Sequence, residues 1–275
     1  MTENTTLAHS TRACTSPAPN LMSQPNHSAS TDQGKAIFSG LPTRIQQALG
    51  QSQRIVLIAN NPSITTETLD ALLHPDDLLV LFNHFIHADY FATSPKASSL
   101  AKLLFFRQIG DSMLHFGLPP RHNNLPSIIK MANQAPTGFL LSNIAYQYPR
   151  LQDDPSPDDD PIDEQVLLEV PDSLRLLLDN PAYSRVLSED HSVVADYPHF
   201  ADIHSSAPSS GFLLYRVMLA LRHYMQHSQE RYLELVLIGF NHDDKTNHFW
   251  AGHNWAFERQ ALTPPPNGVR VIQQY

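Results

Sequence analysis

The stretch that decides the fold is residues 207–258, which reads APSSG (207–211), FLLYRVMLALRHYM (212–225), ELVLIGF (234–240) and NHDDKTNHFWAGHNWAFE (241–258). It predicts a turn of small residues, an amphipathic helix, a buried strand and a polar loop. A helix N-terminus presents free N–H groups and a partial positive charge, so the turn suits an anionic ligand. Gly211 would let that ligand approach the backbone. On local grounds alone, an ordinary serine N-cap is the simpler interpretation.

Two more apolar runs, RIVLIA (54–59) and DLLVLF (77–82), predict strands buried on both faces. A helix starting near Thr65 is expected between them, which makes a βαβ unit. The first run ends in Asn60-Asn61 and the second in Asn83, and ligands collect at the carboxyl ends of such strands. For either asparagine alone, turn formation is the simpler role.

The other expected elements complete an α/β fold with a mostly parallel sheet. Strands are expected from about Lys102 to Phe106 and at 165–170, helices at 40–49, 111–116, 126–134 and 172–179, and either type at 137–142. The segment 179–206 is expected to be irregular, with Tyr197 in a surface loop.

Two segments are expected to lie outside the packed fold. Residues 1–33 are rich in Ser, Thr, Asn, Pro and Gln and predict a disordered tail, which leaves 34–275 as a single domain. Residues 150–164 form an acidic, proline-broken surface loop. It contains an Asp-x-Asp pattern at 158–160, but a metal-binding pair should follow a buried strand, so we interpret it as solvated.

Composition narrows the class of protein. The 275 residues carry a formal net charge of −9, which argues against nucleic acid as a partner. The single cysteine, Cys14, allows no internal disulfide. The N-terminus does not resemble a signal peptide, and no apolar run approaches the ~20 residues that span a bilayer. These features predict a cytoplasmic protein, and they leave peripheral membrane contact open.

The loop after the last apolar run carries the residues suited to catalysis. His248-Phe249-Trp250 is followed by His253, and Glu258 comes five residues later. An imidazole can accept a proton from an attacking hydroxyl or, when charged, stabilise a leaving phosphate. A metal site built from His242, Asp243, His248 and His253 is a rival interpretation, although their spacing fits no standard zinc pattern.

In combination, these segments resemble the sialyltransferase family, glycosyltransferase family 29. Its four motifs appear in order as IVLIANN with VLFN, as PSSG with its helix and LVLIGF, as His248-Phe249-Trp250, and as His253 with Glu258. Ala59 replaces the usual glycine, Ser210 replaces threonine, and the spacing of the last two motifs is short. The cysteine pair of animal members is absent, as expected for a bacterial cytoplasmic relative.

The resemblance implies a variant GT-A-like, Rossmann-type single domain that uses no metal or other cofactor. Nucleotide and donor binding would fall to Asn60, Asn61, Asn83, Ser209, Ser210 and Gly211. His248 would stabilise the departing CMP phosphate, His253 would be the general base, and Trp250 and Glu258 would support them.

The implied activity is inverting transfer of a 2-keto acid sugar, sialic acid or Kdo, from its CMP-activated donor. The acceptor would be a hydroxyl of a lipooligosaccharide or capsule precursor at the inner membrane. The alternatives from other classes are a nucleotide-binding protein without transferase activity and a metal-dependent hydrolase.

Overall fold

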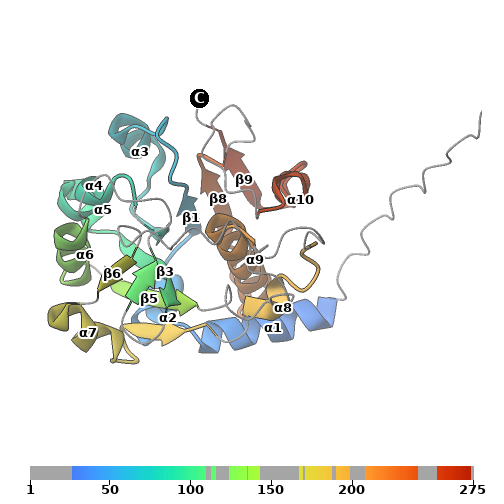
Figure 1. The fold of residues 1–275 in the computed structure, drawn as a ribbon. Coiled ribbons are helices and arrows are strands. Elements are labelled where there is room, and N and C mark those ends of the chain that lie inside the picture. The colour runs from blue at the N-terminus through green and yellow to red at the C-terminus, as the bar shows by residue number, and fades with distance from the viewer. Residues whose placement is uncertain are drawn as a thin grey trace, which may run out of the picture.

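A computed structural model describes residues 27–83, 85–109, 113–115, 124–134, 136–142, 167–169, 171–187, 190–198, 208–240 and 253–273. One sheet lies between two groups of helices (Figure 1). The elements are α1 (His27–Ser39), α2 (Thr43–Leu49), β1 (Arg54–Ile58), α3 (Thr66–Leu72), β2 (Asp77–Phe82), α4 (Ala88–Thr93), α5 (Pro95–Ser98), β3 (Ala101–Ile109), β4 (Met113–His115), α6 (Leu125–Ala132), β5 (Thr137–Ser142), β6 (Leu167–Glu169), α7 (Asp172–Leu178), β7 (Ser184–Val186), α8 (Asp190–Val193), α9 (Ser210–Ser228), β8 (Glu234–Ile238), α10 (Trp255–Ala261) and β9 (Val269–Ile272).

Seven parallel strands form the body of the sheet, in the order β9-β8-β1-β2-β3-β5-β7. This confirms the expected Rossmann-type α/β fold with a mostly parallel central sheet flanked by helices. β1 and β2 are buried along their whole length, as their uninterrupted apolar sequences predict. From β1 the chain first builds outward through β2 and β3, and later returns to the other side of β1 with β8 and β9. The topological switch point therefore lies between β1 and β8.

Alternate side chains of β1 enter two different cores, one on each face of the sheet. Ile55 and Leu57 pack with the core that includes α1, α2 and α9. Val56 and Ile58 pack with the core that includes α3, α4 and α6. The period of two along a strand sends successive side chains to opposite faces, so the short strand contributes to both helical layers.

The helix α9 runs against the direction of the parallel strands. Near its C-terminus, Arg222 Nε donates to the carbonyl of Leu233, which directly precedes β8. Near its N-terminus, Ser210 Oγ accepts a hydrogen bond from Arg107, far along β3. The N-terminus of α9 therefore lies at the carboxyl edge of the sheet, where Rossmann-type folds bind their ligands.

The expected helix at 111–116 is wrong. Residues 113–115 form the strand β4, which pairs antiparallel with the last residues of β3 and with β6. β3 continues to Ile109, beyond the end of β2 at Phe82, and β4 pairs with that extension. A three-residue strand of this kind depends on its partner rather than on its own sequence.

The expected boundary of the disordered tail at residue 33 is also wrong, because α1 begins at His27. A Cβ on Gly34 would stand 2.3 Å from the carbonyl oxygen of Ala220 in α9, so glycine lets the two helices approach closely. Ile37 of α1 is fully buried. This tertiary contact stabilises the helix, which the polar sequence of the segment does not predict.

Three other expectations concern segments that follow β5 in the chain. Tyr197 is buried rather than in a surface loop, and the segment expected to be irregular contains β7 and α8. The acidic segment 150–164 lies outside the described residues. No helix within the described ranges is both long enough and apolar enough to cross a membrane.

Candidate functional site

The candidate site lies at the carboxyl edge of the sheet, around the switch point between β1 and β8. Asn61 follows β1, and its Nδ2 donates across the switch point to the carbonyl of Gly239, at 3.1 Å. Gly239 has a φ of +75°, and a Cβ there would stand 2.5 Å from the side chain of Ile64. Only glycine combines this backbone conformation with so close an approach.

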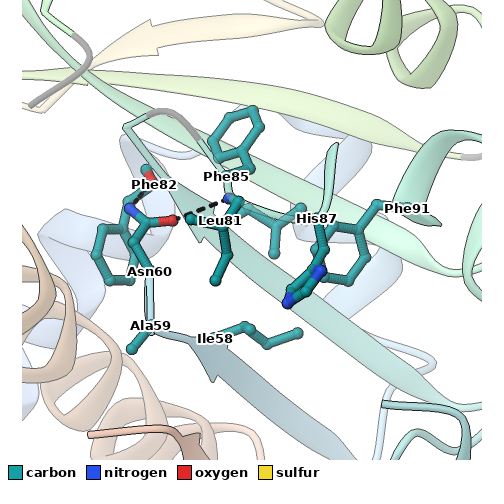
Figure 2. A pocket seen from close by; sticks show the side chains of 9 residues that line it. Ile58, Ala59, Asn60, Leu81, Phe82, Phe85, His87 and Phe91 are labelled. Atoms are coloured by element: carbon teal, nitrogen blue, oxygen red, sulfur yellow. Dashed lines mark hydrogen bonds between the residues drawn. The ribbon is translucent and has the colours of Figure 1, made fainter. Parts of the chain in front are cut away.

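Asn60 ties the end of β1 to the turn after β2 (Figure 2). Its Nδ2 donates to the carbonyl of Phe82 at 2.9 Å, and its Oδ1 accepts from the N–H of Ile86 at 3.3 Å. Both the nitrogen and the oxygen of the Asn60 side-chain amide therefore form hydrogen bonds with the protein backbone. An asparagine side chain retains a second N–H and a second lone pair, so a ligand contact remains chemically open to it.

Asn83 sits at the end of β2 in a left-handed conformation, with φ of 59°. Its N–H donates to the carbonyl of Phe105, but within the described ranges its buried Oδ1 has no hydrogen-bond donor. Phe85, two residues on, also has a positive φ, of 39°, which is rare for an aromatic residue. Strained backbone and an unsatisfied buried acceptor are features that cluster at functional sites.

A small pocket lies beside Asn60, with an accessible volume of only about 10 Å³. That volume holds about one water molecule and is far below the ~300–1,000 Å³ of ordinary small-molecule sites, so the pocket alone is not a ligand site. His87 lines it and forms a 2.7 Å hydrogen bond through Nε2 to the carbonyl of Ile64. The lining residues are Ile58, Ala59, Asn60, Leu81, Phe82, Phe85, Ile86, His87 and Phe91 (Figure 2).

Ser209 is the N-cap of α9, and its Oγ accepts from the N–H of Phe212 at 3.1 Å. The simpler interpretation of this serine is therefore confirmed: Ser209 caps the 19-residue helix, whose first turn, Ser210 to Phe212, is buried. Ser210 Oγ accepts from Nε of Arg107 at 3.1 Å, and Nη2 of Arg107 donates to the carbonyl of Pro208 at 2.6 Å.

Gly211 allows α9 to pack closely against the sheet, because a side chain would crowd the neighbouring rings. That Cβ would stand 3.1 Å from the ring of Phe240 and 3.2 Å from the ring of Phe82. The expected reason for this glycine, room for a ligand at the backbone, is therefore replaced on this side by close contact between α9 and the sheet. The third glycine of dinucleotide-binding motifs has a comparable packing role.

Glu258 of α10 is buried and reaches the start of α9. Its Oε1 accepts from the N–H of Ser209 at 2.9 Å, and its Oε2 accepts from Ser209 Oγ at 2.7 Å. The hydroxyl of Tyr197 donates to Oε1 at 3.0 Å. Burial raises the pKa of Glu258, while the hydrogen bonds from Ser209 and Tyr197 and the charge of Arg107 oppose that rise.

His253 lies two residues before α10 and is partly buried, with its ring 5.0 Å from that of Trp255. The next residue, Asn254, caps α10 with its Oδ1, and its N–H donates to the Tyr197 hydroxyl at 2.6 Å. A continuous hydrogen-bond path therefore runs from the residue beside His253 through Tyr197 and Glu258 to Ser209.

The structure brings together most of the predicted site residues that it describes. Phe82 joins the two groups, because its carbonyl binds Asn60 and its ring lies against Gly211. His248 and Trp250 lie in 241–252, outside the described residues, as do His242 and Asp243 of the rival metal site. Within the described ranges, no three His, Cys, Asp or Glu side chains form a group suited to a metal ion.

Sequence reasoning missed three residues of this edge, namely Arg107, His87 and Tyr197. Arg107 ends a run of buried strand residues, and a cation there is an unusual feature that could have marked it. His87 and Tyr197 carry no comparable signal, because their partners lie far away in the sequence.

No family model, no curated protein and no solved structure matches this chain. The assignment of a function therefore depends on the residues and on the geometry of this edge.

Proposed function

We propose that the protein is an inverting glycosyltransferase that takes a 2-keto acid sugar, sialic acid or Kdo, from its CMP-activated donor. The observation that supports this most directly is the convergence of Asn60, Asn83 and the Ser209–Gly211 turn at one edge of the sheet. These residues come from the segments that resemble the CMP-binding motifs of sialyltransferases.

The charges at this edge suit such a donor. A CMP-sugar carries one phosphate and one sugar carboxylate, and the N-terminus of a long helix stabilises an anion through its N–H groups and dipole. Arg107 places a buried positive charge on one side of the same turn, opposite the buried carboxylate of Glu258 on the other side. A single phosphate can be neutralised by such groups together with an imidazole, so the proposed chemistry requires no divalent ion.

In this proposal His253 is the general base that takes the proton of the acceptor hydroxyl while it attacks the anomeric carbon. His248 would stabilise the departing CMP phosphate. The bond from the anomeric carbon to the phosphate oxygen breaks, the bond to the acceptor oxygen forms, and the anomeric configuration inverts. The proposed acceptor is a lipooligosaccharide or capsule precursor, reached from the cytoplasm at the inner membrane.

A thermal-shift panel with CMP, UDP, GDP and divalent ions tests the donor class. The proposal expects a higher melting temperature with CMP alone, unchanged by a chelator. Stabilisation by a metal without any response to CMP would support the metal-dependent hydrolase instead. Stabilisation by CMP, with no transfer from CMP-sialic acid or CMP-Kdo to glycan acceptors, would leave a nucleotide-binding protein.

A further inference from the structure

The turn at Pro208–Gly211 is held from two sides by side chains of opposite charge. From β3, Arg107 donates to the carbonyl of Pro208 at 2.6 Å and to Ser210 Oγ at 3.1 Å. From α10, Glu258 accepts from both the N–H and the hydroxyl of Ser209. We call these contacts the turn clamp. Both charged side chains are buried, at 8% and 6% exposure, so their hydrogen bonds form with little competition from water.

Glu258 has the role that a glutamate three residues after the N-cap has in a capping box. In a capping box, the serine hydroxyl accepts from the third N–H of the helix, and the glutamate accepts from the N–H of the serine. In α9 the third helical position is Phe212, which cannot accept that bond. Glu258, 49 residues later in the sequence, supplies the carboxylate from another helix.

The same carboxylate also connects the turn to the segment that carries His253. Oε1 of Glu258 binds the Tyr197 hydroxyl, which accepts from the N–H of Asn254, the residue after His253. A displacement of α10 would therefore shift the anion-binding end of α9. A displacement of that end would in turn shift the backbone beside His253.

We infer that Arg107 and Glu258 are positioning residues that keep the first turn of α9 in its ligand-binding form and couple it to the His253 segment through Tyr197. This inference rests on the proposed function for the identity of the ligand, CMP. It predicts that the clamp controls binding, while the link through Tyr197 controls the placement of the general base.

Four variants separate these roles, with CMP affinity measured by calorimetry well below each melting temperature. Glu258→Gln has one acceptor oxygen where the carboxylate has two, so it loses one contact to Ser209 or Tyr197. Arg107→Lys cannot reproduce the two-site donation of a guanidinium. Arg107→Lys should weaken CMP binding by about 10-fold or more, since charge-assisted hydrogen bonds are worth about that much. Glu258→Gln also removes a negative charge beside an anionic ligand, which favours binding, so hydrogen exchange is its readout.

Tyr197→Phe leaves the contacts between Glu258 and Ser209 in place. It should bind CMP within about 2-fold of wild type and lower turnover by about 10-fold or more, because only the link to the His253 segment is lost. The matched control is Glu234→Gln, which alters an exposed ion pair with Arg270 and should change neither quantity. CMP binding by Arg107→Lys at wild-type affinity would overturn the clamp.

Amide hydrogen exchange tests the clamp without any ligand. In Glu258→Gln and Arg107→Lys, the N–H groups of Gly211 and Phe212 should exchange faster than in wild type, while the middle of α9 stays protected. If wild-type protein does not bind CMP, the proposed function fails and this measurement alone decides the clamp. Unchanged exchange at the first turn of α9 would overturn it in that case too.

Discussion

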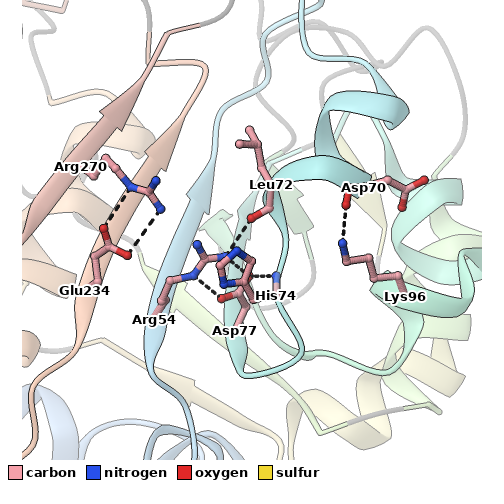
Figure 3. A network of polar contacts seen from close by, with 8 residues as sticks. All are labelled: Arg54, Asp70, Leu72, His74, Asp77, Lys96, Glu234 and Arg270. Carbon is pink, nitrogen blue, oxygen red and sulfur yellow. Dashed lines mark hydrogen bonds and ion pairs between the residues drawn. The ribbon is translucent and has the colours of Figure 1, made fainter.

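Arg54 and Asp77 form a two-bond ion pair at the amino-terminal edge of the sheet, where Nε and Nη2 of Arg54 each donate to a different carboxylate oxygen of Asp77 at 2.7 Å (Figure 3). The pair joins the first residues of β1 and β2, and the two side chains are only 8% and 0% exposed. Asp77 also accepts from the N–H of His74, while Arg54 donates to the carbonyl of Leu72.

Asp77→Ala should therefore lower the free energy of unfolding by about 3–5 kcal/mol, because it leaves the Arg54 charge buried without a partner. Urea denaturation measures the loss. The control is Glu234→Ala, which removes the exposed ion pair with Arg270 on β9 and should cost at most about 1 kcal/mol (Figure 3). Equal losses in the two variants would show that burial does not control the strength of these pairs.

Lys102 should make the stability of the protein rise in alkaline solution. Its side chain is fully buried, burial lowers its pKa to about 8, and its Nζ donates to the carbonyls of Ser98 and Leu100. Between pH 8 and the unfolded pKa of about 10.4, the unfolded chain binds more protons than the folded one. The contribution is therefore complete above that range and is lost as the pH falls through 8.

The expected rise corresponds to about 3 kcal/mol, from a shift of roughly 2.5 pKa units at 1.36 kcal/mol each. Urea denaturation between pH 7 and pH 10.5 measures it. Lys102→Met should lack this component of the pH dependence, whereas Lys96→Met, at a lysine that is only partly buried, should retain it. A variant without Lys102 that still shows the full rise would contradict the assignment.

Gly34→Ala should destabilise the protein even though alanine favours helices. The new Cβ would stand 2.3 Å from the Ala220 carbonyl oxygen and 2.6 Å from Cβ of Tyr224, so α1 must move away from α9. The cost of overpacking is about 1–3 kcal/mol, and the gain in helix propensity is about 1 kcal/mol. Thermal unfolding should show a lower midpoint for Gly34→Ala. The control is Gly50→Ala, at the exposed C-cap of α2 with φ of −61°, and its midpoint should not fall.

His253→Ala should lower turnover by at least ~10² if the residue is the general base, since such a base contributes ~10²–10⁴ in rate. CMP affinity should stay nearly unchanged, because the proposed nucleotide contacts come from Asn60, Asn83 and the α9 turn. His227→Ala, at the exposed far end of α9, is the control and should keep full turnover. A His253 variant with nearly normal turnover would remove this residue from the mechanism.

The elements whose own residues form a distinctive apolar pattern could be predicted from the sequence. β1, β2 and β8 are uninterrupted apolar runs, and α9 is a long apolar stretch after a serine cap. β4 could not be predicted, because it is a strand only where β3 overruns its neighbour. α1 likewise depends on a glycine that fits against another helix.

The same distinction holds for the site. Asn60 and Asn83 follow apolar runs and the serines of the α9 turn precede one, so their positions at the strand and helix ends could be predicted. Their hydrogen-bond partners could not, because Ser210 meets Arg107 from 103 residues away and Ser209 meets Glu258 from 49 residues away. The local sequence does not predict such contacts, because they form only through tertiary packing.

The strand order also sets a problem for synthesis on the ribosome. β1 pairs on one side with β2, which follows it closely, but its other side pairs with β8, whose register partner for Arg54 is Glu234, 180 positions later. At about 5–20 residues per second, the nascent chain would carry that unpaired hydrogen-bonding edge of β1 for roughly 10–40 seconds. An apolar strand with an open edge is a template for aggregation, so the nascent chain depends on a chaperone or on rapid completion until β8 emerges.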